Sequence, residues 1–523
     1  MDRHRAAIVL HAVDAGAGKR ERLACLVLAG ATLPTDDERL VASPALEHVH
    51  AHTEPPWSWK PVSRGSHHWL SQASECAFLQ RSSKEPFPAR SSEARSTSSA
   101  AARARVAHSS GARSCSCVAS ASIRVLSITD PLSTIVQDDV VSRIARVEAW
   151  PANVPLEATY LMASGVVPGI SRTVVKLTTD EGIVGLGEAA SPADAALLRG
   201  ELGRELVGRQ TSDLLAKLGR RELDPPEHRS DAKVLVRNPL AGVEIALWDI
   251  ASREAGVPLH ELLGGAVRSR IEFSEYFAYR PGREESPTDV AAFCARMVEE
   301  HDSPVFEGKV AVHPVEEDVR LVREVRAAIG ADRTLRLDAN MGWRLDTAKR
   351  ALILLEPFDI ANVEEPVGSF EELAELRSSS ATPFSSHTPD VALAAELGVP
   401  DTIVLGLGFC GGIAGTQRFI AACERSGVGF WFYSGDLGIA TAAYLHVAAA
   451  SNYLDRPSQS LLRWTTDDVI ASGPFSPERG VVDVPTGSGL GVELDEPALA
   501  RCAERFAREG AYEFYTGGPV PRF

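Results

Sequence analysis

The C-terminal part of the chain alternates between strand-like and helical segments, and this alternation most limits how it can fold. Helical segments such as 315–330, with Val315, Val319, Val322 and Val325 on one face, separate short apolar runs. Such alternation predicts a parallel β/α architecture. An open doubly wound sheet and a closed barrel both fit, and a count of seven or eight units favours a (β/α)7–8 barrel of the TIM type. The runs are IEFSEYFAY (271–279), VFEGKVAV (305–312), TLRLDAN (334–340), IANVEEP (360–366), TPFSSH (382–387), TIVLGLG (402–408) and GFWFYSG (429–435), with a less clear eighth near SLLRW (460–464).

The first 140 residues have a different character. The stretch 81–117 is rich in Ser, Ala and Arg and has almost no periodic apolar face, so it cannot bury enough surface to offset the entropy of ordering. We expect most of 1–140 to be a disordered leader, an upstream extension from a wrongly chosen start codon. The apolar patches 6–10 and 23–30 are short and separated by charged residues, which is a poor match to a secretory signal.

Composition excludes several classes of function. The 523 residues carry 54 Lys and Arg against 70 Asp and Glu, a net charge of −16, which argues against binding to nucleic acid or to an anionic membrane. No apolar run is long enough to span a bilayer. Eight scattered Cys do not form a disulfide framework, and they fit a cytoplasmic protein with reduced thiols.

Polar residues stand where successive runs end. Lys309 lies toward the end of the second run, Asp338 and Glu364 lie toward the ends of the third and fourth, and His387 ends the fifth. In a barrel these ends meet at one face, where active sites lie. Neighbouring carboxylates repel each other, and a bound divalent cation resolves the conflict. A lysine beside such a cation has its ammonium form disfavoured and can act as a base.

Four segments resemble the enolase superfamily, on its mandelate racemase and muconate lactonizing branch. They are FEGKVAV (306–312), RLDANMGW (336–343), NVEEP (362–366) and the segment 238–265. The segment FWFYSGDLGIATAAYLHVAAA (430–450) is further similar to acid-sugar dehydratases, glucarate dehydratase in particular. The resemblance implies an α+β capping domain over 141–240, a barrel over 241–484 and a segment over 485–523 that returns to the cap.

The resemblance also implies chemistry and partners. Mg²⁺ binds the carboxylate of a small hydroxy acid, a base removes the proton on the adjacent carbon, and the metal stabilises the enediolate. Asp338 and Glu364 match the first two metal ligands, and Lys309 matches the base. Asn340 matches an asparagine near the metal-bound substrate oxygen. A symmetric homo-oligomer is also implied.

The chain departs from the family pattern at several positions. His387 stands at the third ligand position, where imidazole suits Mn, Fe or Zn better than Mg, and Asp390 is the alternative ligand. Glu307 replaces the first lysine of the K-x-K motif. The His–Asp dyad of the dehydratases falls on Phe432 and Gly406. With one base left, elimination is favoured over racemisation, and Tyr433 is a candidate proton donor.

Substrate contacts are expected from the cap and from one barrel loop. Tyr160 and Arg172 lie in the segment 154–173, and Arg suits a distal carboxylate through its forked hydrogen bonds. His313 lies on the loop after the second run. The hypothesis is a divalent-metal-dependent dehydratase of acid sugars.

Three alternatives remain open. One is a racemase or cycloisomerase of the same superfamily, and another is a relative that binds without turnover. The third is a nicotinamide-dependent oxidoreductase, suggested by GLGFCG (406–411), which fits a dinucleotide-binding pattern but falls in the sixth unit rather than the first.

Overall fold

The computed structural model describes residues 6–14, 21–29, 142–223, 239–433 and 435–512. The contacts divide the chain into two units, residues 1–63 and 64–523. In the first unit, β1 (Ala6–Asp14) and β2 (Glu21–Ala29) pair as an antiparallel hairpin. Both strands fall within the expected leader, whose other residues, 81–117 included, lie outside the described ones.

The second unit is built on a sheet of seven parallel strands that follow one another in chain order. Their side chains are buried almost throughout, as expected for a sheet that is covered on both faces. The strands are β7 (Glu275–Phe277), β8 (Val305–Lys309), β9 (Thr334–Asp338), β10 (Ile360–Glu364), β11 (Phe384–Ser386), β12 (Thr402–Leu405) and β13 (Gly429–Phe432).

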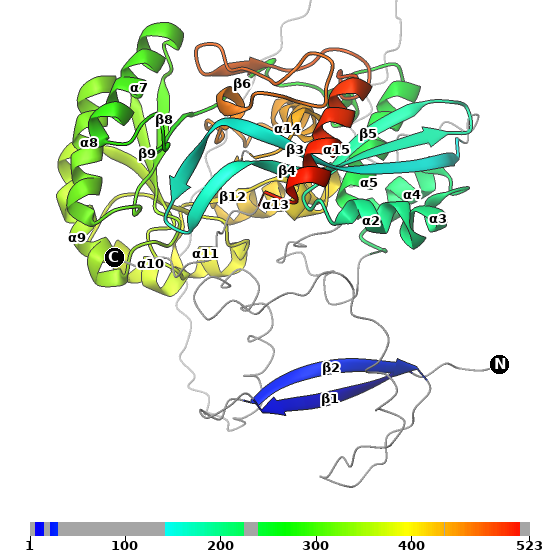
Figure 1. The fold of residues 1–523 in the computed structure, drawn as a ribbon, viewed down its shortest axis with the longest axis horizontal. Helices are drawn as coiled ribbons and strands as arrows, with labels where there is room; N and C mark the ends of the chain where they lie inside the picture. The colour runs from blue at the N-terminus through cyan, green and yellow to red at the C-terminus, as the bar shows by residue number, and fades with distance from the viewer. Residues whose placement is uncertain (1–5, 15–20, 30–141, 224–238, 434, 513–523) are drawn as a thin grey trace, which may run out of the picture. The chain divides into compact units, whose positions relative to one another are not determined.

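Helices connect these strands and pack around the sheet (Figure 1). The apolar face predicted for the segment after β8 is buried in α8. Helix α7 begins with a capping box between Ser286 and Asp289. The helices are α7 (Pro287–His301), α8 (Val315–Ile329), α9 (Leu345–Leu355), α10 (Phe370–Arg377), α11 (Val391–Leu397), α12 (Leu407–Cys410), α13 (Ile413–Ser426) and α14 (Gly438–Ala450), with 3-10 turns η5 (Glu356–Phe358) and η6 (Leu462–Trp464).

The backbone at Ser458 and Gln459 links the chain just before β7 to β13, the last strand of the sheet. Ser458 N donates to Glu272 O at 2.9 Å, and Ser274 N donates to Ser458 O at 2.9 Å. Gln459 N donates to Phe432 O at 3.0 Å. The eighth strand expected at 460–464 is therefore misplaced, because the bridging backbone lies just before it and residues 462–464 form η6.

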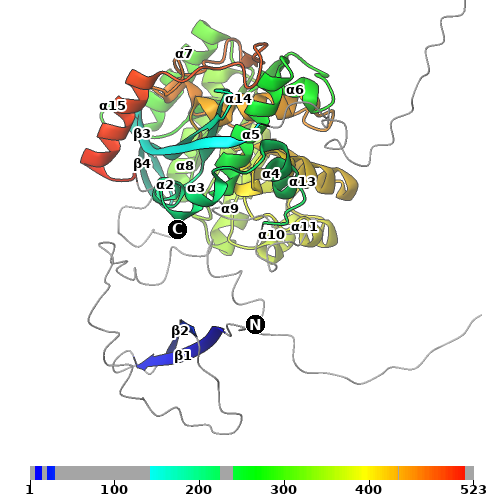
Figure 2. The same cartoon turned by 90° about the vertical axis from the view of Figure 1, so that its right-hand side faces the viewer.

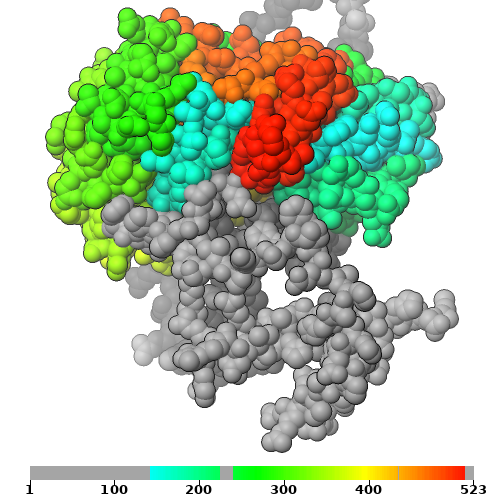
Figure 3. Space-filling model, in the orientation of Figure 1, coloured from blue at the N-terminus to red at the C-terminus, as the bar shows by residue number. Residues whose placement is uncertain are grey.

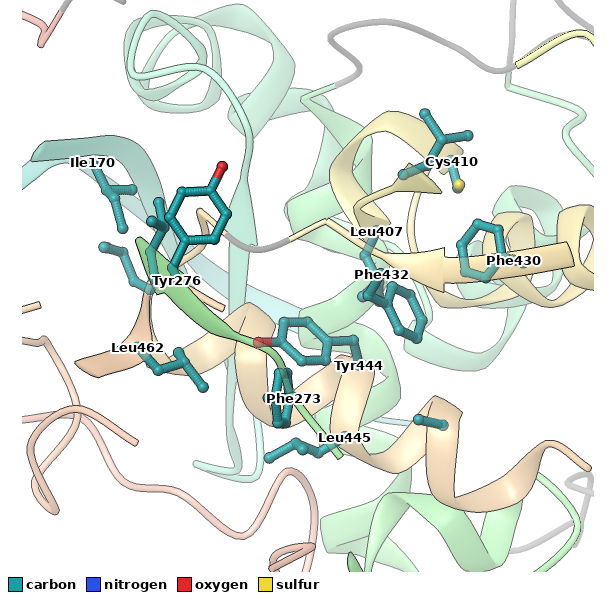
Figure 4. Packing of buried hydrophobic residues seen from close by; sticks show 14 of the residues in the cluster. Ile170, Phe273, Tyr276, Leu407, Cys410, Phe430, Phe432, Tyr444, Leu445 and Leu462 are labelled. Atoms are coloured by element: carbon teal, nitrogen blue, oxygen red, sulfur yellow. The ribbon is translucent and has the colours of Figure 1, made fainter. Parts of the chain in front are cut away.

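Aromatic side chains fill the space behind this closure. Tyr444 of α14 stacks on Phe432 with ring centroids 5.2 Å apart, and it also contacts Phe273, 6.1 Å away (Figure 4). The two ends of the sheet are thus joined by side-chain packing as well as by backbone hydrogen bonds. The expected barrel of the TIM type is confirmed.

The cap contains a three-stranded antiparallel sheet. The hairpin expected over 172–190 is present, since one strand ends at Thr179 and the next begins at Val184. The strands are β3 (Ile144–Met162), β4 (Gly165–Thr179) and β5 (Val184–Ala189), followed by α2 (Asp194–Arg199), α3 (Glu201–Leu206), α4 (Thr211–Gly219), α5 (Leu240–Glu254) and α6 (Leu259–Leu262). A further pair, β6 (Arg270–Glu272) and β14 (Val481–Asp483), is antiparallel.

The C-terminal helix α15 (Glu496–Glu509) packs against the cap strands, as Figures 1 and 2 show. Arg505 Nη1 donates to Asn153 O at 2.7 Å, and Asn153 Nδ2 donates to Gly510 O at 2.7 Å. In Figure 3 the helix lies on the surface beside the cap strands. The chain thus returns from the barrel to β3.

Candidate active site

Three strands end with ionisable side chains at one level of the sheet. Lys309 pairs in register with Asp338, and Asp338 pairs with Glu364. Because side chains alternate along a strand, register partners point to the same face. All three residues are almost fully buried. The structure therefore brings together the residues that the sequence places at the ends of the second, third and fourth runs.

Lys309 and Asp338 form an ion pair. Burial alone lowers the pKa of Lys309, but the charge of Asp338 raises it above its usual value, with smaller contributions from Tyr276 and Tyr160. Burial raises the pKa of Asp338 to about 6, although Lys309 opposes this change. The pair thus holds its proton on the lysine in the absence of substrate.

His387 and Glu364 form a second ion pair, with Nε2 and Oε1 2.9 Å apart. The other ring nitrogen, Nδ1, lies 2.8 Å from the carbonyl oxygen of Val404. Burial lowers the pKa of His387, but the carboxylate of Glu364 outweighs burial and raises it to about 10. Burial would raise the pKa of Glu364, yet His387 lowers it to about 2.

Asn340 lies beside the first pair. Its backbone N donates to Asp338 Oδ1 at 2.8 Å and its Nδ2 donates to Asp338 Oδ2 at 3.2 Å. A φ of 45° places it in the left-handed region, which asparagine tolerates better than most residues. Its Oδ1 atom is shielded from solvent and has no hydrogen-bond partner among the described residues, which leaves an acceptor without a donor.

Tyr433 and Arg172 meet on the other side of the site. The ring of Tyr433, which follows β13, lies 5.6 Å from the ring of His387. Arg172 of β4 is buried, and its Nε lies 3.0 Å from Asp436 Oδ1. Its other nitrogens donate to the backbone oxygens of residues 171, 190 and 435. Protein groups thus engage the guanidinium that the sequence suggested for a substrate carboxylate.

Tyr160 and His313, the other predicted substrate contacts, lie on different elements, one in the cap and one on a barrel loop. Tyr160 of β3 packs against Tyr276 and Trp464, with ring centroids 6.0 and 5.5 Å away, and it is one of the groups that raise the pKa of Lys309. A cap residue therefore borders the site. His313 packs edge-on against Tyr279 at 4.7 Å, on the loop that leads from β8 to α8.

Gln459 is a site residue that sequence reasoning missed. Its Nε2 lies 2.6 Å from Glu307 Oε1 and 2.8 Å from Glu364 Oε2, and both carboxylates accept from it. Arg336, the register partner of Glu307, lies 3.7 Å from it. Glu307 and Arg336 each lie two residues before a site residue, Lys309 or Asp338. Because side chains alternate along a strand, this spacing could have predicted that they pair deeper in the barrel. No pattern marks Gln459, because it lies on irregular chain far along the sequence.

The donor set only partly suits a divalent cation: Asp338, Glu364 and His387 are usual ligand types, and Glu364 Oε1 is buried with no hydrogen-bond partner among the described residues. Within the described ranges, no group of three or more His, Cys, Asp or Glu side chains could hold a metal ion. Lys309 and His387 each compensate one of the two carboxylates. Asp390, the alternative third ligand, caps α11 by accepting a hydrogen bond from Leu393 N at 3.0 Å.

The glycine pattern at 406–411 has a packing role. It follows β12, the sixth strand of the sheet, and precedes the short helix α12. A Cβ added at Gly408 would lie 2.9 Å from Ala190 Cβ at the end of the cap sheet. The missing side chain lets the cap approach the barrel.

None of the helices within the described residues is both long and apolar enough to cross a membrane.

Comparison with known proteins follows the same division into cap and barrel. Residues 144–264 match the mandelate racemase / muconate lactonizing enzyme N-terminal domain, and residues 289–498 match the enolase C-terminal domain-like family. A probable glucarate dehydratase from Streptomyces coelicolor is 28% identical over 368 residues, which cover 64% of this chain and 84% of the relative. Relatives at 25–28% identity carry the names of epimerases and cycloisomerases.

Solved structures agree in fold. An enolase from Streptomyces coelicolor, described as a putative sugar isomerase, is 31% identical with a TM-score of 0.62, over 71% of this chain and 99% of that one. An enolase from Thermobispora bispora, complexed with magnesium and formate, is 27% identical with a TM-score of 0.63, over 72% and 95% of the two chains. This chain therefore belongs to the enolase superfamily, in its mandelate racemase and muconate lactonizing enzyme branch.

Proposed function

We propose that the protein is a dehydratase of acid sugars, a lyase that removes the proton next to a carboxylate and expels the neighbouring hydroxyl as water. One observation carries the proposal: Lys309, in register with Asp338, lies at the strand ends beside Asn340, whose Oδ1 lacks a partner within the described part of the chain. The glucarate dehydratase name of one relative supports the reaction class. The coarser statement, an enolase-superfamily enzyme, does not depend on this choice.

Lys309 is the proposed base. Lys309 is in the ammonium form in the free pair, because Asp338 raises its pKa, so it must first give its proton to Asp338 when substrate binding disrupts the ion pair. The amine then takes the α-proton of the substrate, and the electron pair of that C–H bond forms the new double bond as the β-hydroxyl leaves. The hydroxyl takes up a proton from Tyr433 and departs as water, and the enol tautomerises to a 2-keto-3-deoxy acid.

Other residues bind and orient. Asn340 Oδ1 accepts a substrate hydroxyl, and Tyr160 and His313 are proposed contacts from the cap and from the β8 loop. Arg172 is not proposed as a substrate contact. It is proposed to act only by holding the cap in place. The expected cofactor, Mg²⁺ with Mn²⁺ as the alternative, rests on relatives such as the magnesium-bound enolase, and no step above passes through a metal. A cytoplasmic homo-oligomer is part of the proposal on family grounds alone.

The test is a panel of aldonic and aldaric acids, assayed for keto acids with semicarbazide, with and without Mg²⁺ or Mn²⁺. Exchange of the α-proton in D₂O, followed by NMR, detects proton abstraction even where elimination fails. We expect keto acid from at least one panel member. Full activity of Lys309→Ala on that substrate would contradict the mechanism.

A second candidate is binding without turnover. It is favoured because both cations of the site are engaged by carboxylates and because Gly406 and Phe432 occupy the aligned dyad positions. Ligand-dependent stabilisation with neither keto acid nor α-proton exchange across the panel would support it over the dehydratase.

A further inference from the structure

We propose that the buried contact between His260 and His446 is an acid-sensitive joint, which holds α6 and the segment 485–494 on α14 at neutral pH and releases them in acid. His260 lies on α6 and His446 on α14, and the two helices pack side by side (Figure 2). The proposal does not rest on the proposed function, because the contacts of this pair involve no residue of the candidate active site.

Three segments of the chain meet at the ring of His446, which has no exposed surface. Its Nδ1 atom lies 2.9 Å from Nδ1 of His260, and the two rings stack with their centroids 5.1 Å apart. The backbone N of His260 donates to the same Nδ1 atom at 3.4 Å. On the other side of the ring, Nε2 lies 3.2 Å from the carbonyl oxygen of Leu490. One imidazole of α14 therefore contacts both α6 and the segment 485–494.

The two partners of His446 are also bonded to each other. Leu259 N donates to Gly489 O at 2.8 Å, and Gly489 N donates to Val257 O at 3.0 Å. The start of α6 and the segment around Gly489 are thus joined by backbone hydrogen bonds. They lie on α14 as one unit, and loss of the imidazole contacts would weaken the attachment of both.

The surroundings of His446 fit a neutral imidazole with its hydrogen on Nε2. The carbonyl oxygen of Leu490 only accepts, so Nε2 is the donor, and Nδ1 faces the backbone N–H of His260, so Nδ1 is the acceptor. The ring of His260 must then donate from its own Nδ1, since a single hydrogen fits between the two nitrogens. A second proton on His446 would face two donors, and both contacts with His260 would break.

Burial makes this second proton unfavourable while the joint is closed. Burial lowers the pKa of His446 from 6.5 to about 4, and His260 lowers it further, although the carbonyl of Leu490 opposes the change. The stabilisation from the neutral ring is therefore complete above pH 6.5 and is lost as the pH falls through 4. Between these values the released form takes up a proton that the closed form refuses.

Charged groups on the surrounding elements bond to partners other than His446. They are Glu261 on α6, Asp249 and Arg253 on α5, Glu188 on β5, Arg268 and Arg270 at the start of β6, Arg418 on α13 and Glu493 in the segment 485–494. Within the described ranges, no carboxylate offsets a positive charge on His446.

Asp249 is the neighbouring group whose titration acts on the same segment. It accepts a hydrogen bond from Leu490 N at 2.8 Å, and burial raises its pKa. A carboxyl group with a raised pKa favours the folded form as the pH falls. Asp249 therefore opposes release in acid, and the histidine pair is the group that drives it.

The test is hydrogen–deuterium exchange of the full-length protein at about pH 7.5 and about pH 5, followed by mass spectrometry. Exchange times are scaled for the pH dependence of the chemical step. We expect peptides that cover 257–265 and 486–492 to lose protection by about tenfold at the lower pH, relative to peptides that cover β9 and β10.

Three variants assign the effect to the pair. His446→Asn removes the titrating ring but leaves an amide oxygen that can accept from His260, so its protection should change less than about twofold between the two pH values. If that variant does not fold, His260→Asn replaces it, and the loss in acid should be at least about threefold smaller than in wild type, because an amide oxygen can accept from a protonated His446. His301→Asn, at the end of α7 beside Glu300, is the matched control and should respond as wild type does.

Equal protection of the two segments at both pH values would overturn the proposal. An acid-induced loss of wild-type size in the histidine variants would overturn it too, because another group would then drive release. So would a loss shared equally by β9 and β10, since that is global unfolding. None of these readouts uses turnover, so an inactive protein would count against the proposed dehydratase and leave this result intact.

Discussion

Lys309 and Asp338 are register partners in β8 and β9, and their side chains form a buried ion pair. The pairing gives the lysine a neighbour that can receive its proton. It also ties the proposed base to the strand that carries Asn340. This one contact therefore sets both the position and the protonation state of Lys309.

Replacing Lys309 by Arg should keep the ion pair but remove the base, because arginine does not lose its proton in proteins. We expect α-proton exchange to fall about 10²–10⁴-fold with little change in Tm. Exchange is measured by NMR in D₂O on any active substrate. Lys349→Arg, at a surface position paired with Glu375, is the matched control. Wild-type exchange rates in Lys309→Arg would rule out this lysine as the base.

The His387–Glu364 pair should make stability depend on alkaline pH. The pKa of His387 rises from 6.5 to about 10 on folding. Its contribution to stability is therefore complete below 6.5 and is lost as the pH rises through 10. We expect Tm to fall more steeply between pH 7 and 10 in wild type than in His387→Gln. Parallel Tm profiles would show that the pair does not stabilise the fold.

Arg172 should act on stability rather than on substrate affinity. Its removal in Arg172→Ala leaves Asp436 and Glu188 buried without their cation. Breaking a buried pair in this way should lower the free energy of unfolding by about 3–5 kcal/mol, measured by urea titration. Arg146→Ala, at an exposed ion pair on β3, should change it little. A raised KM with unchanged stability would instead assign Arg172 to the substrate.

Gln459 should stabilise the folded protein through its hydrogen bonds to the buried carboxylates of the site. In Gln459→Leu, Glu307 and Glu364 each lose a hydrogen-bond donor, and we expect a loss of about 2–4 kcal/mol from two buried acceptors. Gln417→Leu, on α13, tests the same change elsewhere. If both variants unfold at the wild-type urea concentration, the two hydrogen bonds contribute nothing measurable.

A chain that begins at residue 141 should fold. The family match begins at 144, and the backbone oxygen of Ser142 already accepts from Thr211 N at 3.0 Å. We expect the shortened protein to unfold cooperatively with a Tm within about 3 °C of the full chain. Loss of cooperative unfolding would assign a structural role to residues before 141.

Much of the fold could be predicted from local pattern. The strands β8 to β13 lie within the predicted runs, because buried parallel strands are short apolar segments between amphipathic helices. The ends of those runs also located Lys309, Asp338 and Glu364. The prediction of an eighth strand at 460–464 was wrong. The chain makes only an isolated backbone bridge at Ser458, and such a bridge leaves no periodic pattern in the sequence.

The sequence by itself determined which ionisable residues meet, because parallel strands in register carry the ends of successive units to one edge. Only the tertiary structure decided what each residue bonds to. His387 meets Glu364, Arg172 meets Asp436, and Gln459 joins two carboxylates from a distant segment. Those partners depend on burial and side-chain direction across long stretches of chain, and neither spacing nor composition encodes them.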